Sequence, residues 1–203
     1  MMKARRIRSH RGFSLIELLV VVAIMMAVAA VALPSFLSFI STYKLRSTLQ
    51  QTSGMLQQMR MQAVRLNKNI KVQTTTMGTQ TVGYADVNGN GAWDKNTVPP
   101  EPAVLFPTDI TVTSTGHPGN ATTSLGFTPQ TGSGVMPQFN ARGLPCVMAG
   151  SVCQNFDASG QVGFVVYVRN QSSGGGVSWG AITITPAGRV RSWLWNGTAY
   201  TGL

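Results

Sequence analysis

Residues 13–40 read FSLIELLVVVAIMMAVAAVALPSFLSFI and contain one charged side chain, Glu17. Within this stretch, residues 18–33 form an unbroken apolar run. With its flanks the run approaches the roughly 20 residues that a helix needs to cross a bilayer at about 1.5 Å per residue. We therefore predict a transmembrane helix over residues 13–40. Pro34 is expected to kink or loosen it, because proline removes one intrahelical hydrogen bond.

Residues 1–12 read MMKARRIRSHRG and carry five positive charges and no acid. Because basic residues flank a transmembrane helix on its cytoplasmic side, we predict a cytoplasmic N-terminus and a C-terminal domain across the membrane. The segment departs from an ordinary secretory signal, whose small-residue cleavage site follows the apolar core. Here the small-residue junction, Gly12-Phe13, precedes the core, and Glu17 lies near its start. An ionisable residue in a membrane segment indicates function, and an interfacial glutamate that reaches the headgroups is the alternative.

The composition of the 203-residue chain excludes several classes of protein. Its 16 Lys and Arg against 6 Asp and Glu give a net charge of +10, and removal of residues 1–12 lowers it to +5. Charged residues are only 11% of the chain, against roughly 25% in a typical soluble domain, which argues against a histone-like binder. The hydrophobic content of 43% argues against disorder. With two histidines, two cysteines, sparse acids and no phosphate-binding loop, we expect neither an enzyme nor a required cofactor.

Residues 41–69 continue at helical spacing, with apolar side chains on one face and Gln, Arg and Lys on the other. The apolar positions are Leu45, Leu49, Met55, Leu56, Met59, Ala63 and Leu66. We predict one long helix whose amphipathic second half packs on a sheet, with Gly54 as a weak point. Residues 70–203 change to a period of 2, broken by Gly, Pro, Asn and Ser clusters, which predicts antiparallel strands. The expected strands are 70–76, 80–85, 103–106, 110–114, 124–127, 163–168, 178–185 and 190–195.

The N-terminal sequence RGFSLIELLVVVAIMMAVAAVALP resembles the class III signal of type IV pilins and type II secretion pseudopilins. Gly12, Phe13 and Glu17 match its basic leader ending in Gly, then Phe, then Glu as the fifth residue after the cut. The resemblance implies an α+β, pilin-like fold with a long N-terminal α-helix packed on a C-terminal antiparallel β-sheet domain. Its parts would be a leader (1–12), a transmembrane and assembly helix (13–40), an amphipathic helix half (41–69) and a β-rich periplasmic or extracellular domain (70–203).

The resemblance also implies a route through the membrane. A prepilin peptidase would cut between Gly12 and Phe13 and methylate the new amine of Phe13. The chain would first be a single-pass inner-membrane protein with a periplasmic C-terminal domain, and would then enter a pilus or pseudopilus filament. Its partners would be other pilin or pseudopilin subunits, the prepilin peptidase, the inner-membrane assembly platform and the membrane. In an apolar filament core Glu17 would pair with the Phe13 amine of a neighbouring subunit, because an unpaired buried carboxylate is costly.

Residues 86–94, DVNGNGAWD, imitate the start of a calcium-binding loop. The oxygen ligands would come from Asp86, Asn88, Asn90 and Asp94. The twelfth position is Thr97, so the bidentate acid is missing. Two successive Asn-Gly pairs instead favour a structural hairpin, with a weak calcium site as the alternative. The motif resembles the Asp/Asn/Gly-rich hairpin common in the GspH/FimT branch of pseudopilins.

Two cysteines, Cys146 and Cys153, are separated by six residues. In a domain expected outside the cytoplasm, where disulfides persist, we predict that they form a disulfide. Closing so small a loop contributes about 2.5 kcal/mol in the chain-entropy estimate. Two buried free thiols are the alternative.

Near the C-terminus, residues 188–195 read GRVRSWLW and predict a strand with Arg189, Arg191, Trp193 and Trp195 on one face. Two cations and two aromatic rings can bind phosphates by charge and bases by stacking. The alternative is a hairpin in which the tryptophans cover the core and the arginines are solvated. The Gly-Arg-Val-Arg segment resembles a motif of FimT-type minor pilins that bind DNA in natural transformation.

Together these features predict a non-enzymatic minor pilin or pseudopilin of the GspH/FimT family. It would be incorporated into a type II secretion pseudopilus or a type IV pilus and would help filament assembly and protein secretion. The alternative function is that of a DNA-binding minor pilin, which takes up DNA through Arg189 and Arg191.

Overall fold

The computed structural model describes residues 13–96, 98, 100–119, 121, 136–150, 152–157, 160–172 and 176–203. The leader with Gly12, the position of Thr97 and the strand expected at 124–127 lie outside the described residues. One helix and thirteen strands are described. Their bounds are α1 (Leu15–Leu66), β1 (Ile70–Met77), β2 (Gln80–Asp86), β3 (Ala103–Phe106), β4 (Ile110–Thr113), β5 (Gln138–Phe139), β6 (Val147–Ala149), β7 (Val152–Gln154), β8 (Phe156–Asp157), β9 (Gly160–Gln161), β10 (Phe164–Ser172), β11 (Gly176–Ile184), β12 (Val190–Trp195) and β13 (Tyr200–Gly202).

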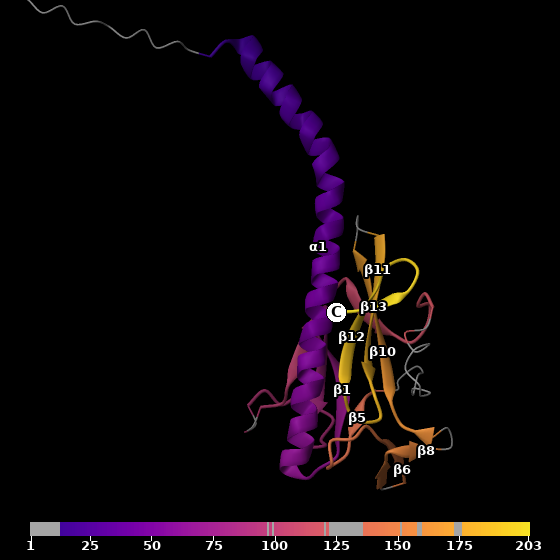
Figure 1. Ribbon diagram of the computed structural model, residues 1–203. Helices are drawn as coiled ribbons and strands as arrows, with labels where there is room; N and C mark the ends of the chain where they lie inside the picture. The colour runs from indigo at the N-terminus through magenta and orange to yellow at the C-terminus, as the bar shows by residue number, and fades with distance from the viewer. Residues whose placement is uncertain are drawn as a thin grey trace, which may run out of the picture.

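The helix α1 is continuous over 52 residues and passes through Pro34 without a break. Its N-terminal half curves away from the β domain and extends beyond it, whereas its C-terminal half lies along the sheets (Figure 1). The helix ends at Leu66, a few residues earlier than expected, because Asn67 adopts the left-handed conformation with φ of 50°. That conformation terminates helices, and the following backbone N–H groups return to the last carbonyls of α1.

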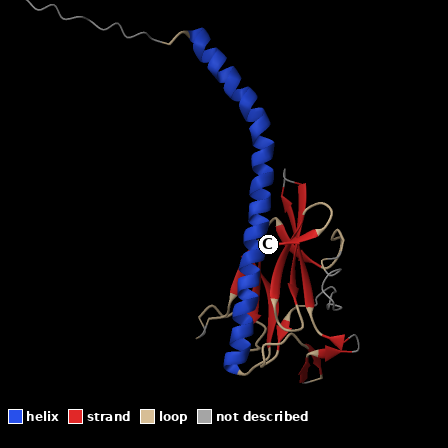
Figure 2. Cartoon of the chain, viewed as in Figure 1, coloured by secondary structure: helices blue, strands red, loops and turns tan. Residues whose placement is uncertain are grey.

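Two antiparallel sheets form the body of the β domain and share the helix as a third layer (Figure 2). One has the strand order β3-β2-β1-β5 and the other β13-β12-β11-β10-β4. Two small hairpins, β6-β7 and β8-β9, lie at the end of the domain farthest from the N-terminal half of α1 (Figure 1). The α+β architecture expected from the sequence is confirmed.

Most of the expected strands are present, and the strands that the sequence did not predict are short. The strands expected at 70–76, 80–85, 103–106, 110–114 and 190–195 match β1, β2, β3, β4 and β12 to within about a residue. The pair β10 and β11 was expected to be shorter, because polar residues at their joined ends obscure the alternation. Five strands of two or three residues in the described chain, β5 to β9, and the three-residue β13 have too few positions for a period of 2 to be recognised.

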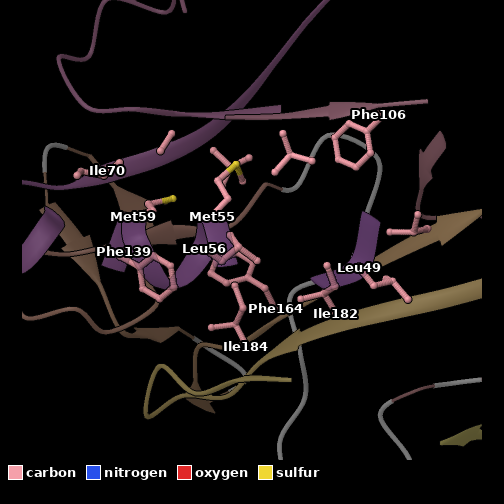
Figure 3. Close-up of a cluster of buried hydrophobic side chains, with 14 of the residues drawn as sticks. Leu49, Met55, Leu56, Met59, Ile70, Phe106, Phe139, Phe164, Ile182 and Ile184 are labelled. Atoms are coloured by element: carbon pink, nitrogen blue, oxygen red, sulfur yellow. The ribbon is translucent and has the colours of Figure 1, made fainter. Parts of the chain in front are cut away.

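The core lies between the C-terminal half of α1 and the inner faces of both sheets (Figure 3). Six of the seven apolar helix positions named from the sequence are buried with at most 5% exposure, Leu66 being the exception; the six are Leu45, Leu49, Met55, Leu56, Met59 and Ala63. They contact strand residues such as Ile70, Phe139 and Phe164. The expected apolar stripe of the helix is therefore confirmed as core.

A polar contact holds α1 to the sheet close to where the helix leaves the domain. The Lys44 ammonium lies 2.9 Å from the Asp109 carboxylate. One helical turn earlier, the fully buried side-chain amide of Asn170 donates to the Ser41 carbonyl at 2.8 Å. These contacts set the point at which the helix departs from the β domain.

The ion pair between Lys44 and Asp109 predicts that acid weakens the attachment of α1 to the sheet. The hydrogen bond from Lys44 lowers the pKa of Asp109 below its ordinary value of 3.8. Because the folded-state pKa is depressed, the stabilisation is present above the ordinary pKa and is lost as the pH falls through the folded pKa. We expect the unfolding free energy of the detergent-solubilised chain, measured with urea, to fall over this acid range, and to fall less steeply in Asp109→Asn. An unchanged slope in that variant would contradict the assignment.

Candidate functional site

The N-terminal half of α1 presents an uncovered apolar surface. Between Leu15 and Phe39 its large apolar side chains are exposed, from 41% at Val21 to 81% at Leu15. It is long and apolar enough to cross a membrane. Phe13 is 77% exposed just before the helix, and Glu17 lies in its first turn, where the helix dipole favours an acid. The structure thus brings Phe13 and Glu17 to the same end of this surface, while their pairing between subunits stays a prediction.

The Asn/Gly-rich segment forms the long connection between β2 and β3. These strands pair antiparallel, so the expected hairpin is confirmed, but its connection spans 87–102 instead of a tight Asn-Gly turn. The reason is a second set of hydrogen bonds that folds the connection back. Tyr84, on β2, donates its hydroxyl to the Gly91 carbonyl at 2.8 Å. Burial, followed by the charge of Asp86, raises the pKa of Tyr84.

The acids of this connection accept hydrogen bonds from it. Asp86 accepts the N–H groups of Gly89 at 2.7 Å and Gly91 at 3.0 Å. The side-chain amides of Asn88 and Asn90 donate to Asp94 at 2.6 and 2.8 Å. In the described part of the chain no group of three or more His, Cys, Asp and Glu side chains is placed to hold a metal ion. A calcium site at these four residues stays a prediction.

Glu101 is a structural acid that sequence reasoning missed. It is 5% exposed, and its carboxylate accepts the backbone N–H groups of Val87 at 2.9 Å and Asp94 at 2.8 Å. Glu101 therefore holds the start and the middle of the connection against its C-terminal end. The sequence signal that could have identified Glu101 is its position between Pro100 and Pro102, just before β3. Its spacing does not show that its carboxylate bonds to residues across the loop.

The predicted disulfide between Cys146 and Cys153 is confirmed. Cys146 is fully buried, and its backbone N–H donates to the Gln138 carbonyl at 3.1 Å. The bond thus fastens the exposed β6-β7 hairpin to the strand β5. In this small hairpin it replaces the apolar core that so few residues cannot form.

The four residues that the alternation placed on one face of β12 differ in their exposure. Arg189 and Arg191 are exposed. Trp193 donates its indole N–H to the Thr183 hydroxyl at 2.8 Å, and both tryptophans pack on a second apolar cluster on the outer face of the sheet. The structure agrees with the alternative that the arginines are solvated, and the tryptophans cover this second apolar cluster, not the main core. The arginines therefore offer charge beside tryptophans that are only partly exposed.

The exposed arginines border a groove between α1 and β12. One part of it, of about 690 Å³, is lined by Gln50, Ser53, Gly54, Gln57, residues 189–193, Gly202 and Leu203. A second part, of about 730 Å³, continues along α1 and is lined by Gln57, Arg60, Met61, Val64, Arg65 and residues 188–190. The C-terminus lies beside α1 (Figure 1), and Gly202 and Leu203 line the first part of the groove. The charged side chains that line the two parts are those of four arginines.

Arg60 builds one end of this groove, and its role was not recognised from the sequence. Its guanidinium donates to the Gly143 carbonyl at 2.9 Å and to the Gly188 carbonyl at 3.1 Å. These residues are 83 and 128 positions away in the chain. The contact joins α1 to the loop after β5 and to the turn before β12, and so places Arg189.

Two family models match the chain. The prokaryotic N-terminal methylation motif matches residues 7–33, which include Gly12, Phe13 and Glu17. The type II transport protein GspH matches residues 48–144, from the buried half of α1 to the loop after β5. Comparison with curated proteins and with solved structures gave no match. The disulfide hairpin and the strands β10 to β13 lie beyond the matched ranges, so their roles rest on the structure alone.

Proposed function

Because this chain belongs to the GspH family of type II secretion pseudopilins, which are structural and not enzymatic, we propose that it is a minor subunit that helps to assemble the pseudopilus. In this proposal residues 13–40 anchor the chain in the inner membrane with the β domain in the periplasm. The inner-membrane assembly platform then transfers the helix from the lipid into the filament, where it packs among the helices of other subunits.

The exposed half of α1 is the observation that supports this proposal. Its apolar side chains have no cover from the β domain, and contiguous apolar surface of this size requires lipid or protein around it. A single helix suits both surroundings, since all its backbone hydrogen bonds are internal. The same surface can therefore serve first as an anchor and then as an assembly interface.

Processing by a prepilin peptidase is the first test of the proposal. When the full-length chain is co-expressed with the peptidase, we expect the loss of residues 1–12 and one added methyl group on Phe13, both seen by intact-mass spectrometry. Gly12→Val should remain full length, because the larger side chain obstructs the cut. If the chain keeps residues 1–12 while another pseudopilin in the same cells is processed, the proposal fails.

DNA binding through Arg189 and Arg191 is a second candidate function. The observation that favours it is the exposure of both arginines on a groove whose charged lining side chains are all those of arginines. The partly buried tryptophans weigh against stacking of bases, so binding would depend on phosphate charge and fall steeply with salt. This function stays a prediction that a labelled duplex tests directly.

A further inference from the structure

The groove between α1 and β12 has the dimensions of an extended chain. Between Gln50 and Arg65, which line its two ends, α1 rises by about 22 Å at about 1.5 Å per residue. An extended strand of about six or seven residues covers that length at about 3.3 Å per residue. The two parts share Gln57, Arg189 and Val190, so a single segment can pass from one to the other.

One wall of the groove is an incompletely paired strand. The strand β13 pairs only with Trp193–Trp195, in the second half of β12, and the N–H of Leu203 then donates to the Ser192 carbonyl at 3.0 Å. Backbone groups alternate in direction along a strand. The N–H and C=O of Val190 therefore point to the same side as those of Ser192, into the groove. At Val190 this edge can therefore exchange main-chain hydrogen bonds with another backbone.

The opposite wall allows a backbone to come close. Gln50, Ser53, Gly54 and Gln57 follow one another at helical spacing and line the groove. A Cβ added to Gly54 meets nothing within 4 Å, so no packing within the subunit requires glycine here. A glycine in a helix interior costs about 0.5–1 kcal/mol relative to alanine. The open space above Gly54 and the amides of Gln50 and Gln57 together suit a polypeptide backbone.

The charge of the groove defines the side chains of the ligand. Arg189 and Arg191 are two residues apart at its strand wall and are both exposed. Residues two apart on an added strand share a face and lie opposite such a pair. Acidic side chains at alternate positions therefore match both arginines.

We propose that this groove, formed by residues 50–65 of α1 and residues 188–193, binds an extended acidic polypeptide segment that pairs with the edge of β12 at Val190. In the filament the segment would belong to a neighbouring subunit, and this identity rests on the proposed function. The binding itself is a property of the groove. A polypeptide fits better than DNA, because the strand edge and the space above Gly54 suit a backbone, whereas Trp193 is partly buried and Trp195 does not line the groove.

The probe is a fluorescein-labelled peptide of about six residues with alternating valine and glutamate, and fluorescence anisotropy measures its binding to the detergent-solubilised full chain. We expect binding that weakens at least about tenfold when glutamine replaces glutamate in the peptide. Arg189→Gln with Arg191→Gln should weaken it to a similar extent. Gly54→Leu should do so as well, because its side chain fills the groove without any change of charge. Leucine also favours the helix over glycine, so this variant should fold.

Two control variants match these changes outside the groove. Arg142→Gln removes an exposed arginine, and Gln58→Leu adds leucine to an exposed helix position; both should bind within about twofold of the unaltered chain. Equal binding of the two peptides, or unaltered binding by Gly54→Leu, would overturn the proposal. So would a labelled DNA duplex that binds more tightly than the peptide and is insensitive to Gly54→Leu. Processing and filament incorporation are measured separately. A negative peptide-binding result therefore does not contradict the proposed function, and a failure of processing does not contradict peptide binding by the groove.

Discussion

Glu17→Leu is expected to leave cleavage after Gly12 unchanged but to lower incorporation of the chain into the pseudopilus at least about tenfold. In the proposed filament core, Glu17 pairs with the Phe13 amine of a neighbouring subunit. Removing one partner of a buried ion pair costs about 3–5 kcal/mol, because the other charge stays buried without compensation. Each 1.4 kcal/mol corresponds to about a tenfold change in an equilibrium. Even a partly solvated pair would therefore produce a large loss.

Sheared filaments and cell membranes are compared by immunoblot in this experiment, and intact mass reports cleavage. Glu17→Asp, which keeps the charge on a shorter side chain, should recover part of the incorporation. Ile16→Leu alters the adjacent exposed position without a change of charge and should behave like the unaltered chain. If Glu17→Leu enters filaments normally, the pairing is wrong, although the membrane anchor is unaffected.

Gly188→Ala should destabilise the β domain by about 2–4 kcal/mol, through backbone strain and a steric overlap acting together. Gly188 has φ of +78°, which L-residues rarely adopt. A Cβ at this position would lie 2.7 Å from the Gly143 carbonyl oxygen and 3.0 Å from the Arg60 guanidinium. The turn and the loop after β5 must then separate, which breaks the contacts of Arg60 with both.

Gly89→Ala measures the cost of backbone strain at a glycine without a steric overlap. Its φ of +77° is almost the same, but a Cβ there meets nothing within 4 Å. We expect a loss of only about 1 kcal/mol for this variant. Urea unfolding of the detergent-solubilised chain gives both values. Equal losses would show that the overlap at Gly188 adds nothing to the cost of its backbone strain.

The parts of the fold that the sequence predicts are those with local signals. The buried stripe of α1 from Leu45 to Ala63 is readable because helical periodicity is a property of neighbouring residues. The long strands β1, β2 and β12 are readable for the same reason. The disulfide follows from two cysteines and the compartment, without a need for the fold.

Only part of the candidate site could be predicted from the sequence. Arg189 and Arg191 could be named from their alternation, but not the groove beside them. Arg60 contacts residues 83 and 128 positions away, and Glu101 reaches back 14 positions across a loop, so no periodic spacing connects them to their partners. The exposure of Trp193 and Trp195 also depends on what covers the outer face of the sheet, where a Cβ on Gly119 would lie 3.2 Å from Trp195.

The sequence by itself determined that this chain has an apolar N-terminal helix with one acid, a methylation motif and a β domain. These properties depend on composition and on contacts within a few residues, which the linear order contains. Only the tertiary structure decided that β12 lies beside α1 with part of its edge open, and that Arg60 holds the turn at Gly188. Such contacts arise because folding closes loops of more than a hundred residues, and their partners are selected by shape and burial in three dimensions.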